Sequence, residues 1–193
     1  GFEAWATFKV RDHFENWPIR SREFRRWIAA RHYEENGGTL GGQAMEDALR
    51  VLDARAVNEG PQHRVFIRSG ETPGVIWIDL GDANWRAVKI TAVGWEIVSQ
   101  PECKFRRCQA MLPMPDPEKG AFIEELESFV RVSKQEDMLL IVAWLVTSLR
   151  PNGPFPILLV NGEHGSAKST TSRMLRKLVD PARAPLRPAP HDV

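Results

Sequence analysis

The segment that most restricts the fold is an apolar run followed by a glycine-rich turn. Residues 156–160 are Pro-Ile-Leu-Leu-Val, and residues 162–170 are Gly-Glu-His-Gly-Ser-Ala-Lys-Ser-Thr. A short continuous apolar run is typical of a parallel strand that is covered on both faces. The turn fits the phosphate-loop pattern G-x-x-x-x-G-K-[ST], except that Ala167 replaces the last glycine. The pattern therefore predicts a strand, a phosphate-binding turn and a helix, as at the start of an α/β nucleotide-binding domain.

The residue types in this turn are those that bind a nucleoside triphosphate. Backbone N–H groups of residues 163–169 would surround the β-phosphate, and the helix N-terminus adds partial positive charge. Lys168 is the predicted catalytic residue, because its ammonium group would stabilise charge on the γ-phosphate, and Ser169 is the predicted Mg²⁺ ligand. ATP and Mg²⁺ are thus the predicted cofactors. The predicted nucleotide-binding residues are Gly162, Glu163, His164, Gly165, Ser166, Ala167, Lys168, Ser169 and Thr170.

Two positions in the turn carry specific expectations. We expect alanine in place of glycine at position 167 to cost little free energy, because φ is negative where a helix starts. A side chain at Gly165 would cost more if that residue needs a positive φ. His164 is expected either near the nucleotide or facing solvent.

The first half of the sequence predicts helices and an antiparallel sheet. Residues 3–10 and 14–19 form an expected strand pair, followed by helices at about 22–35 and 43–57. Ser21 is a good N-cap for the first helix, and Gly37-Gly38 ends it. The apolar stripes of the two helices are expected to meet as an αα-hairpin. Further on, four short β-rich runs predict an antiparallel meander, at residues 65–68, 75–80, 87–90 and 95–98.

Residues 111–120 contain three prolines and no periodicity, so the expected domain boundary lies there. We predict an α+β accessory domain at 1–110, with two helices plus the antiparallel sheet. The N-terminal part of an α/β P-loop NTPase domain is predicted at 111–193. That part should contain helices at about 122–131 and 135–150. The second is apolar on almost every side and is expected to be buried.

Only 24 residues follow Ser169, too few for the later strands of a P-loop ATPase. We therefore expect a segment of a longer protein that hydrolyses ATP negligibly on its own.

Residues 154–170, Pro-Phe-Pro-Ile-Leu-Leu-Val-Asn-Gly-Glu-His-Gly-Ser-Ala-Lys-Ser-Thr, resemble bacterial and phage P-loop ATP-binding proteins. These are related to the primase-helicase ATPases of mobile elements, which are of the AAA+ or superfamily-three-helicase type. Residues 140–145, Leu-Ile-Val-Ala-Trp-Leu, are similar to the helix that precedes the loop in that family. The resemblance implies a DNA-dependent ATPase or helicase of phage or mobile-element replication. It leaves open whether the full-length protein forms a homo-oligomer. A non-motor P-loop phosphotransferase and a non-enzymatic adaptor for DNA or protein remain alternatives.

Charge does not select a nucleic-acid partner, because 26 Lys and Arg nearly cancel 25 Asp and Glu. Two local basic groups could contact DNA phosphates, although a solvated helix face is the favoured interpretation. Arg31 lies near the apolar stripe of its helix and is expected to pair with Glu46 or Asp53. The basic groups consist of Arg22, Arg25 and Arg26, and of Arg106 and Arg107.

Other patterns exclude several classes of site and location. Asp79 ends an apolar strand, but Asp79 and Asp82 are three apart and should point to opposite faces, which disfavours a paired-carboxylate metal site. Cys103 and Cys108 lack the further ligands of a zinc site and are expected to be free thiols. The longest apolar run, 138–146, has nine residues, too few to cross a bilayer. A cytoplasmic protein without membrane contact is the resulting prediction.

Overall fold

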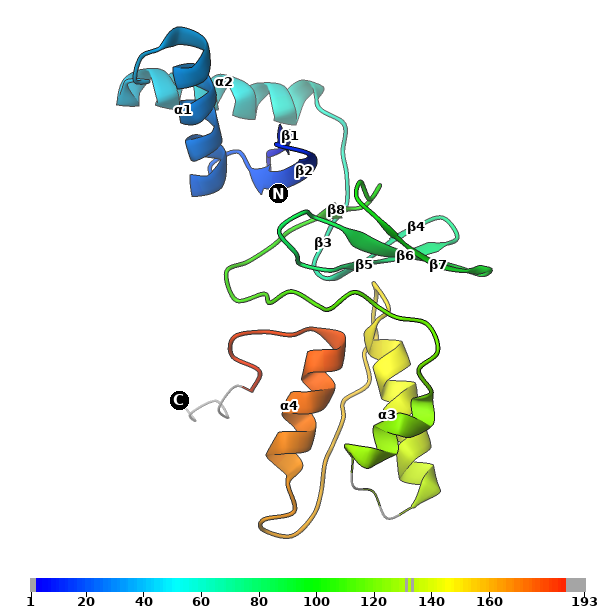
Figure 1. Cartoon of the computed structure of the whole chain (residues 1–193). Helices are drawn as coiled ribbons and strands as arrows, with labels where there is room; N and C mark the ends of the chain where they lie inside the picture. Colours follow the sequence, from blue (N-terminus) through cyan, green and yellow to red (C-terminus); the bar gives the residue numbers. More distant parts are fainter. Residues whose placement is uncertain (1–2, 131, 133, 187–193) are drawn as a thin grey trace. The chain divides into compact units, whose positions relative to one another are not determined.

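The computed structural model describes residues 3–130, 132 and 134–186, and the chain divides into two compact units (Figure 1). These units are Gly1–Val65 and Phe66–Val193. The proline-rich segment 111–120, where we expected the boundary, lies inside the second unit. Its backbone is bonded there on both sides: Met114 N donates to Leu80 O at 2.8 Å, and Leu112 N donates to Pro181 O at 3.0 Å.

The first unit contains a β-hairpin and two helices. Strands β1 (Trp5–Val10) and β2 (His13–Pro18) pair antiparallel, followed by α1 (Arg22–Asn36) and α2 (Gly42–Glu59). The predicted cap of α1 is confirmed, because Ser21 Oγ accepts a hydrogen bond from Phe24 N at 3.2 Å. Gly37 ends the helix with φ 68°, the left-handed conformation that glycine adopts most easily.

Apolar side chains of α1, α2 and the β-hairpin share one core, but the helices cross steeply and do not pair side by side as the expected αα-hairpin (Figure 1). The buried members of this core are Phe8, Ile19, Phe24 and Leu49. The acids expected to pair with Arg31 are used by other arginines: Arg25 contacts Glu46 at 2.7 Å, and Arg20 contacts Asp53 at 3.1 Å. Arg31 instead pairs with Glu35 one turn along its own helix, at 2.8 Å. The expected pairing of Arg31 was therefore wrong.

The sheet of the second unit is an antiparallel meander of four strands in the order β4-β5-β6-β7. The strands are β4 (Ser69–Thr72), β5 (Val75–Asp79), β6 (Ala87–Thr91) and β7 (Gly94–Val98). The first expected strand, 65–68, does not join it. Arg68 has φ 60° and turns the chain, so that β4 begins one residue later. β3 (Val65–Phe66) pairs with β8 (Lys104–Phe105) in a separate small sheet.

Both faces of the meander are covered by apolar side chains. Trp77 and Ala87 lie on one face with Phe66, Cys103 and Phe105. Ile78 and Val88, which are opposite each other in the register, lie on the other face with Leu80. The two sets alternate along β5 and β6, as expected for strands whose side chains point to opposite faces in turn.

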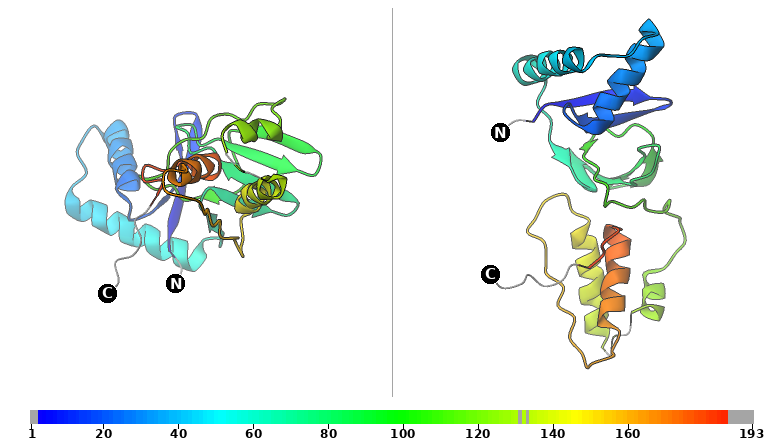
Figure 2. Two further views of the ribbon diagram at one scale, coloured as in Figure 1. Left: turned by 90° about the horizontal axis from the view of Figure 1, so that it is seen from below. Right: turned by 90° about the vertical axis from the view of Figure 1, so that its left-hand side faces the viewer.

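The C-terminal part of this unit is helical, and Figure 2 shows α3 (Gln135–Ser148) beside α4 (Lys168–Val179). Their shared core contains Val130, Met138, Ile141 and Leu175. Leu139 and Leu140 are exposed, so the described residues cover one side of this apolar helix and leave the other side open. The other expected helix is a 3₁₀ helix, η1 (Ile123–Ser128), and residue 131 of the expected range lies outside the described residues.

The expected strand at 156–160 does not form among the residues that the structure describes. Ile157 and Leu159 are 93% and 79% exposed, and the segment pairs with no named strand. A strand requires a neighbour to satisfy its backbone groups, and the described chain places none beside it. No helix within the described ranges is both long and apolar enough to cross a membrane.

Candidate nucleotide-binding loop

The segment 161–167 is a loop that leads directly into helix α4. His164 and Gly165 form a turn, and the helix begins at Lys168. Gly165 has φ 81°, so the positive φ that would require glycine is present at this position. The turn and the following helix therefore occur where the motif predicts them, whereas the preceding strand does not.

The expectation for Ala167 was wrong. Ala167 has φ 60° and ψ 19°, the left-handed conformation, and it is the N-cap residue of α4. Its β-carbon opposes this conformation by about 1–2 kcal/mol. The phosphate-loop pattern has glycine at this position, because glycine adopts the left-handed conformation without this cost.

The side chain of Lys168 folds back over the loop. Its Nζ donates to Gly162 O at 2.9 Å, to Glu163 O at 2.6 Å and to Ser166 Oγ at 3.3 Å. The loop thus curves around one ammonium group, with three oxygen acceptors from three different residues. These bonds hold a positive charge on the inner side of the turn.

The N-terminus of α4 has no competing negative group in its own first turn. No side chain caps it, and its first turn contains no acid. The first N–H groups of an α-helix have no partner within the helix and carry partial positive charge. Ser169, Thr170 and His164 are exposed at this end. Backbone donors, a lysine and two hydroxyl groups therefore share one short segment, which is the donor set that binds phosphate.

The described residues contain no group of three or more His, Cys, Asp or Glu side chains that could hold a metal ion. Cys103 is buried, Cys108 is exposed, and neither is in a disulfide bond.

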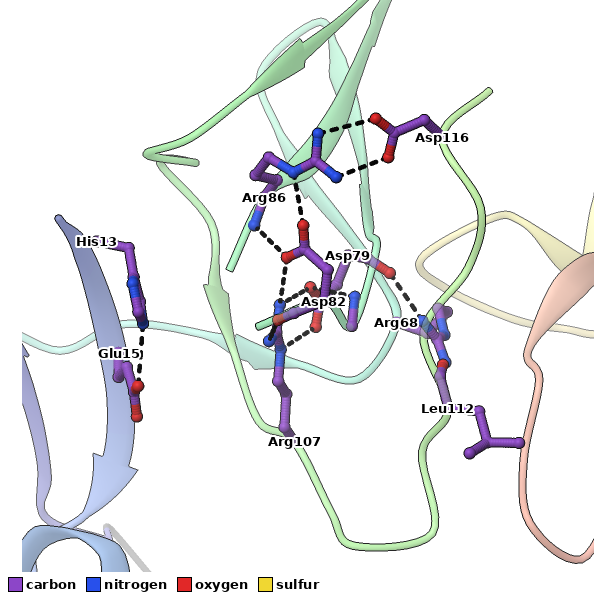
Figure 3. Close-up of polar contacts among 10 residues, drawn as sticks. His13, Glu15, Arg68, Asp79, Asp82, Arg86, Arg107, Leu112 and Asp116 are labelled. Atoms are coloured by element: carbon purple, nitrogen blue, oxygen red, sulfur yellow. Dashed lines mark hydrogen bonds and ion pairs between the residues drawn. The ribbon is translucent and has the colours of Figure 1, made fainter. Parts of the chain in front are cut away.

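A buried cluster of arginines and aspartates, not predicted from the sequence, lies at the end of β5 (Figure 3). Asp79 is 1% exposed and accepts two hydrogen bonds from Arg107, at 2.5 Å and 2.9 Å. Arg107 also donates to Asp82 O and lies over the ring of Trp85. The one available signal was Asp79 itself, because an acid at the end of a buried apolar strand needs a cationic partner.

This cluster corrects two expectations. Asp79 and Asp82 do not point to opposite faces, because β5 ends at Asp79 and Gly81, with φ 67°, turns the chain. Arg107, a candidate DNA contact, has only a tenth of its side chain exposed and is committed to Asp79. Arg107 is thus part of the folded core of its unit.

Arg68 joins three segments of the second unit. It is 3% exposed, and it donates to Asp79 O at 2.9 Å, to Leu112 O at 2.8 Å and to Asp180 Oδ1 at 3.0 Å. Asp180 follows the last residue of α4. The helix that begins at the candidate loop is therefore attached to the sheet at its far end.

Arg86 forms a second, more exposed ion-pair group. It contacts Asp82 and forms two hydrogen bonds with Asp116, at 2.9 Å and 2.7 Å. These bonds to Asp116 and Asp82 raise the pKa of Arg86, so the guanidinium stays charged. Asp116 lies in the proline-rich segment, which this pair holds to the sheet.

The remaining candidate DNA contacts differ in their exposure and in whether they form ion pairs. Arg22, Arg26 and Arg106 are exposed. Arg25 is half-buried and bonded to Glu46, and this hydrogen bond lowers the pKa of Glu46, as do the nearby charges of Arg20 and Arg50. Of the five arginines, Arg25 and Arg107 are therefore engaged in ion pairs within their own units.

Residues 123–193 match the family described as "Actinomycete integrative conjugative element replication protein". This segment, shorter than half of the chain, contains α3, the candidate loop and α4. No curated protein matches the sequence. No solved structure matches it either. The match indicates a replication-related protein of a mobile element, and the C-terminal segment of this chain is similar to replication proteins of actinomycete integrative conjugative elements.

Proposed function

We propose that the loop at 162–170 binds the phosphates of ATP together with Mg²⁺, as part of a DNA-dependent ATPase of mobile-element replication. One observation carries the proposal: the loop folds around the Lys168 ammonium and passes directly into the uncapped N-terminus of α4. Anions bind where backbone N–H groups and a helix N-terminus converge. The similarity to mobile-element replication proteins covers the same segment and supports a role with DNA.

Each residue has a separate role in this proposal. Lys168 exchanges its bonds to Gly162 O and Glu163 O for phosphate oxygens, because a charged acceptor binds an ammonium group more strongly than a neutral carbonyl does. Ser169 offers its hydroxyl to Mg²⁺, and the backbone of the loop surrounds the β-phosphate. The proposal assigns no essential charge to the other residues of the loop, which are Glu163, His164, Ser166 and Thr170.

The proposal concerns binding first, because hydrolysis needs more than this loop. A P-loop ATPase also uses an acidic Mg²⁺ partner and an arginine finger. Asp79, the buried acid at the end of β5, is committed to Arg107 and is not such a partner. We therefore expect ATP binding with negligible turnover by this chain. DNA-stimulated hydrolysis would separate a helicase-like ATPase from a phosphotransferase.

The experiment measures binding of a fluorescent ATP analogue to the full chain in the presence of Mg²⁺. Lys168→Ala should weaken binding about 10- to 100-fold, the range for one hydrogen bond to a charged group. The matched control is Lys177→Ala, which removes the same charge from the exposed last turn of α4 and should leave binding unchanged. Equal effects of the two substitutions, or no saturable binding by the unmodified chain, would contradict the proposal.

A further inference from the structure

We infer that a groove in the first unit binds single-stranded nucleic acid. The groove lies between the β1–β2 hairpin and α1, and its volume is about 580 Å³. The hairpin contributes Lys9 and Arg11, and α1 contributes Trp27, Arg31 and Glu34. We call it the hairpin groove. It involves none of the residues of the loop at 162–170, so it stands independently of the proposed nucleotide site.

The hairpin groove is lined by more basic than acidic side chains. Lys9 and Arg11 are exposed, and neither forms an ion pair within residues 3–130, 132 and 134–186. Arg31 is held in position by Glu35 at 2.8 Å and by Glu34 at 3.7 Å. Two uncommitted cations therefore stand beside a fixed arginine, with Glu34 as the one acid in the lining.

Arg11 occupies a strained position at the tip of the hairpin. Its φ is 52°, in a two-residue turn between β1 and β2 where Asn, Asp or Gly is usual. A bulky residue in this conformation costs free energy that a smaller turn residue would not. This cost in free energy falls on a charged residue that lines the hairpin groove, which agrees with a role in binding.

Trp27 provides a fixed aromatic surface in the same groove. Its Nε1 donates to Lys9 O at 3.2 Å. Its ring stacks on Phe24, with centroids 5.9 Å apart and an interplanar angle of 11°, and also contacts Phe8. The indole is thus immobilised by the core before any ligand arrives, so stacking a base on it loses little side-chain entropy.

Together these features fit a single strand better than a duplex or an acidic peptide. Proteins that bind single strands combine a positively charged groove for the backbone with an aromatic surface for the bases. A paired base cannot leave its duplex to reach Trp27 without an unstacking cost. An acidic peptide would use Lys9 and Arg11 but would have no planar group for the indole. Lys9 and Arg11 belong to the β1–β2 hairpin and Trp27 belongs to α1, and both line the same groove; Figure 2 shows this hairpin beside α1.

The test is binding of a fluorescently labelled oligothymidylate of about 12 nucleotides, within the usual site sizes, to the full chain. The double variant Lys9→Ala, Arg11→Ala should weaken binding at least about tenfold at low salt. It should also reduce the slope of log K against log salt by about 1.4, since each phosphate contact on a single strand contributes ~0.7. The matched control, Arg50→Ala with Arg55→Ala, removes two exposed cations from α2 of the same unit and should leave the affinity and the slope unchanged.

Two further ligands decide the class of partner. An abasic oligonucleotide of the same length should bind more weakly, because it lacks the stacking group, and polyglutamate should not displace the oligothymidylate. Equal binding of the thymidylate and abasic strands, or equal effects of the two double variants, would overturn the inference. Lys168→Ala should leave oligonucleotide binding intact, so that failure of the nucleotide proposal and failure of this one are told apart. Circular dichroism checks that every variant is folded.

Discussion

At the scale of single residues, the backbone conformation of Ala167 is unfavourable for a residue that has a β-carbon. The residue has φ 60°, whereas glycine would adopt the same conformation without the clash of a β-carbon. We expect Ala167→Gly to raise the free energy of unfolding of the second unit by up to about 1 kcal/mol, since part of the relief is offset by greater freedom in the unfolded chain. Gly165→Ala, at φ 81°, should lower it by about 1 kcal/mol.

Urea denaturation followed by circular dichroism measures both changes. The matched control is Ala143→Gly, the same substitution at an exposed position inside α3, which should destabilise by about 1 kcal/mol. If both Ala→Gly substitutions destabilise equally, the left-handed conformation of Ala167 is not the relevant feature.

The pair of Asp79 and Arg107 also acts at the residue scale. Asp79→Asn would remove the main counter-charge of the Arg107 guanidinium, which is a tenth exposed, and leave only the more distant Asp82 carboxylate at 4.0 Å. Breaking a buried pair from one side costs about 3–5 kcal/mol. We expect a loss of this size in the urea-derived stability of the second unit. Arg106→Ala, an exposed neighbour, should change stability by less than about 0.5 kcal/mol. A small effect of Asp79→Asn would show that water reaches this pair.

At the scale of elements, α4 depends on its packing against α3 and on contacts that follow its C-terminus. Leu175 is fully buried between α3 and α4, and beyond the last turn Asp180 and Pro181 bond to Arg68. Arg68→Ala removes a buried side chain that satisfies several carbonyl groups at once, so the segments that it joins should open more often.

Hydrogen exchange tests this at two amides. Leu112 N bonds to Pro181 O at 3.0 Å, and Arg183 N bonds to Ala110 O at 2.9 Å. Both should exchange at least about tenfold faster in Arg68→Ala, a change of about 1.4 kcal/mol in opening free energy. Amides of α1 in the first unit serve as the internal control and should not change. Unaltered exchange at Leu112 and Arg183 would mean that Arg68 does not hold α4 to the sheet.

At the scale of the whole molecule, the two compact units imply where a protease cuts first. Residues 60–64 connect α2 to β3, have no regular secondary structure and are exposed. Residues 111–120 also lack regular structure, but Met114 and Asp116 bond to the sheet. Cleavage requires local opening, which is rarer where the backbone is bonded.

We therefore expect limited trypsin digestion to cut after Arg64 and to release fragments that begin near residue 65. N-terminal sequencing and mass spectrometry identify the site. Lys119 offers trypsin a comparable bond beside the proline-rich segment and serves as the internal comparison. Faster cleavage there would instead support the domain boundary that the prolines predict.

The sequence by itself determined the features that depend on a few neighbouring residues. The Ser21 cap, the end of α1 at Gly37 and the turn of β1 into β2 are all local. The passage from the loop into α4 at Lys168 belongs with them. Caps, turns and helical periodicity act within about one turn of chain, so their signal is complete in the sequence.

Only the tertiary structure decided which distant groups meet. Asp79 pairs with Arg107 across 28 positions and Arg68 with Asp180 across 112, and no local pattern selects these partners among the arginines and acids of the chain. The apolar run at 156–160 also shows that a local pattern does not determine which segments pair. Its composition suits a covered strand, but a strand exists only beside another strand, and the described chain supplies none there. Pairing between distant segments is a property of the folded chain, because its free energy comes from groups that the sequence leaves far apart.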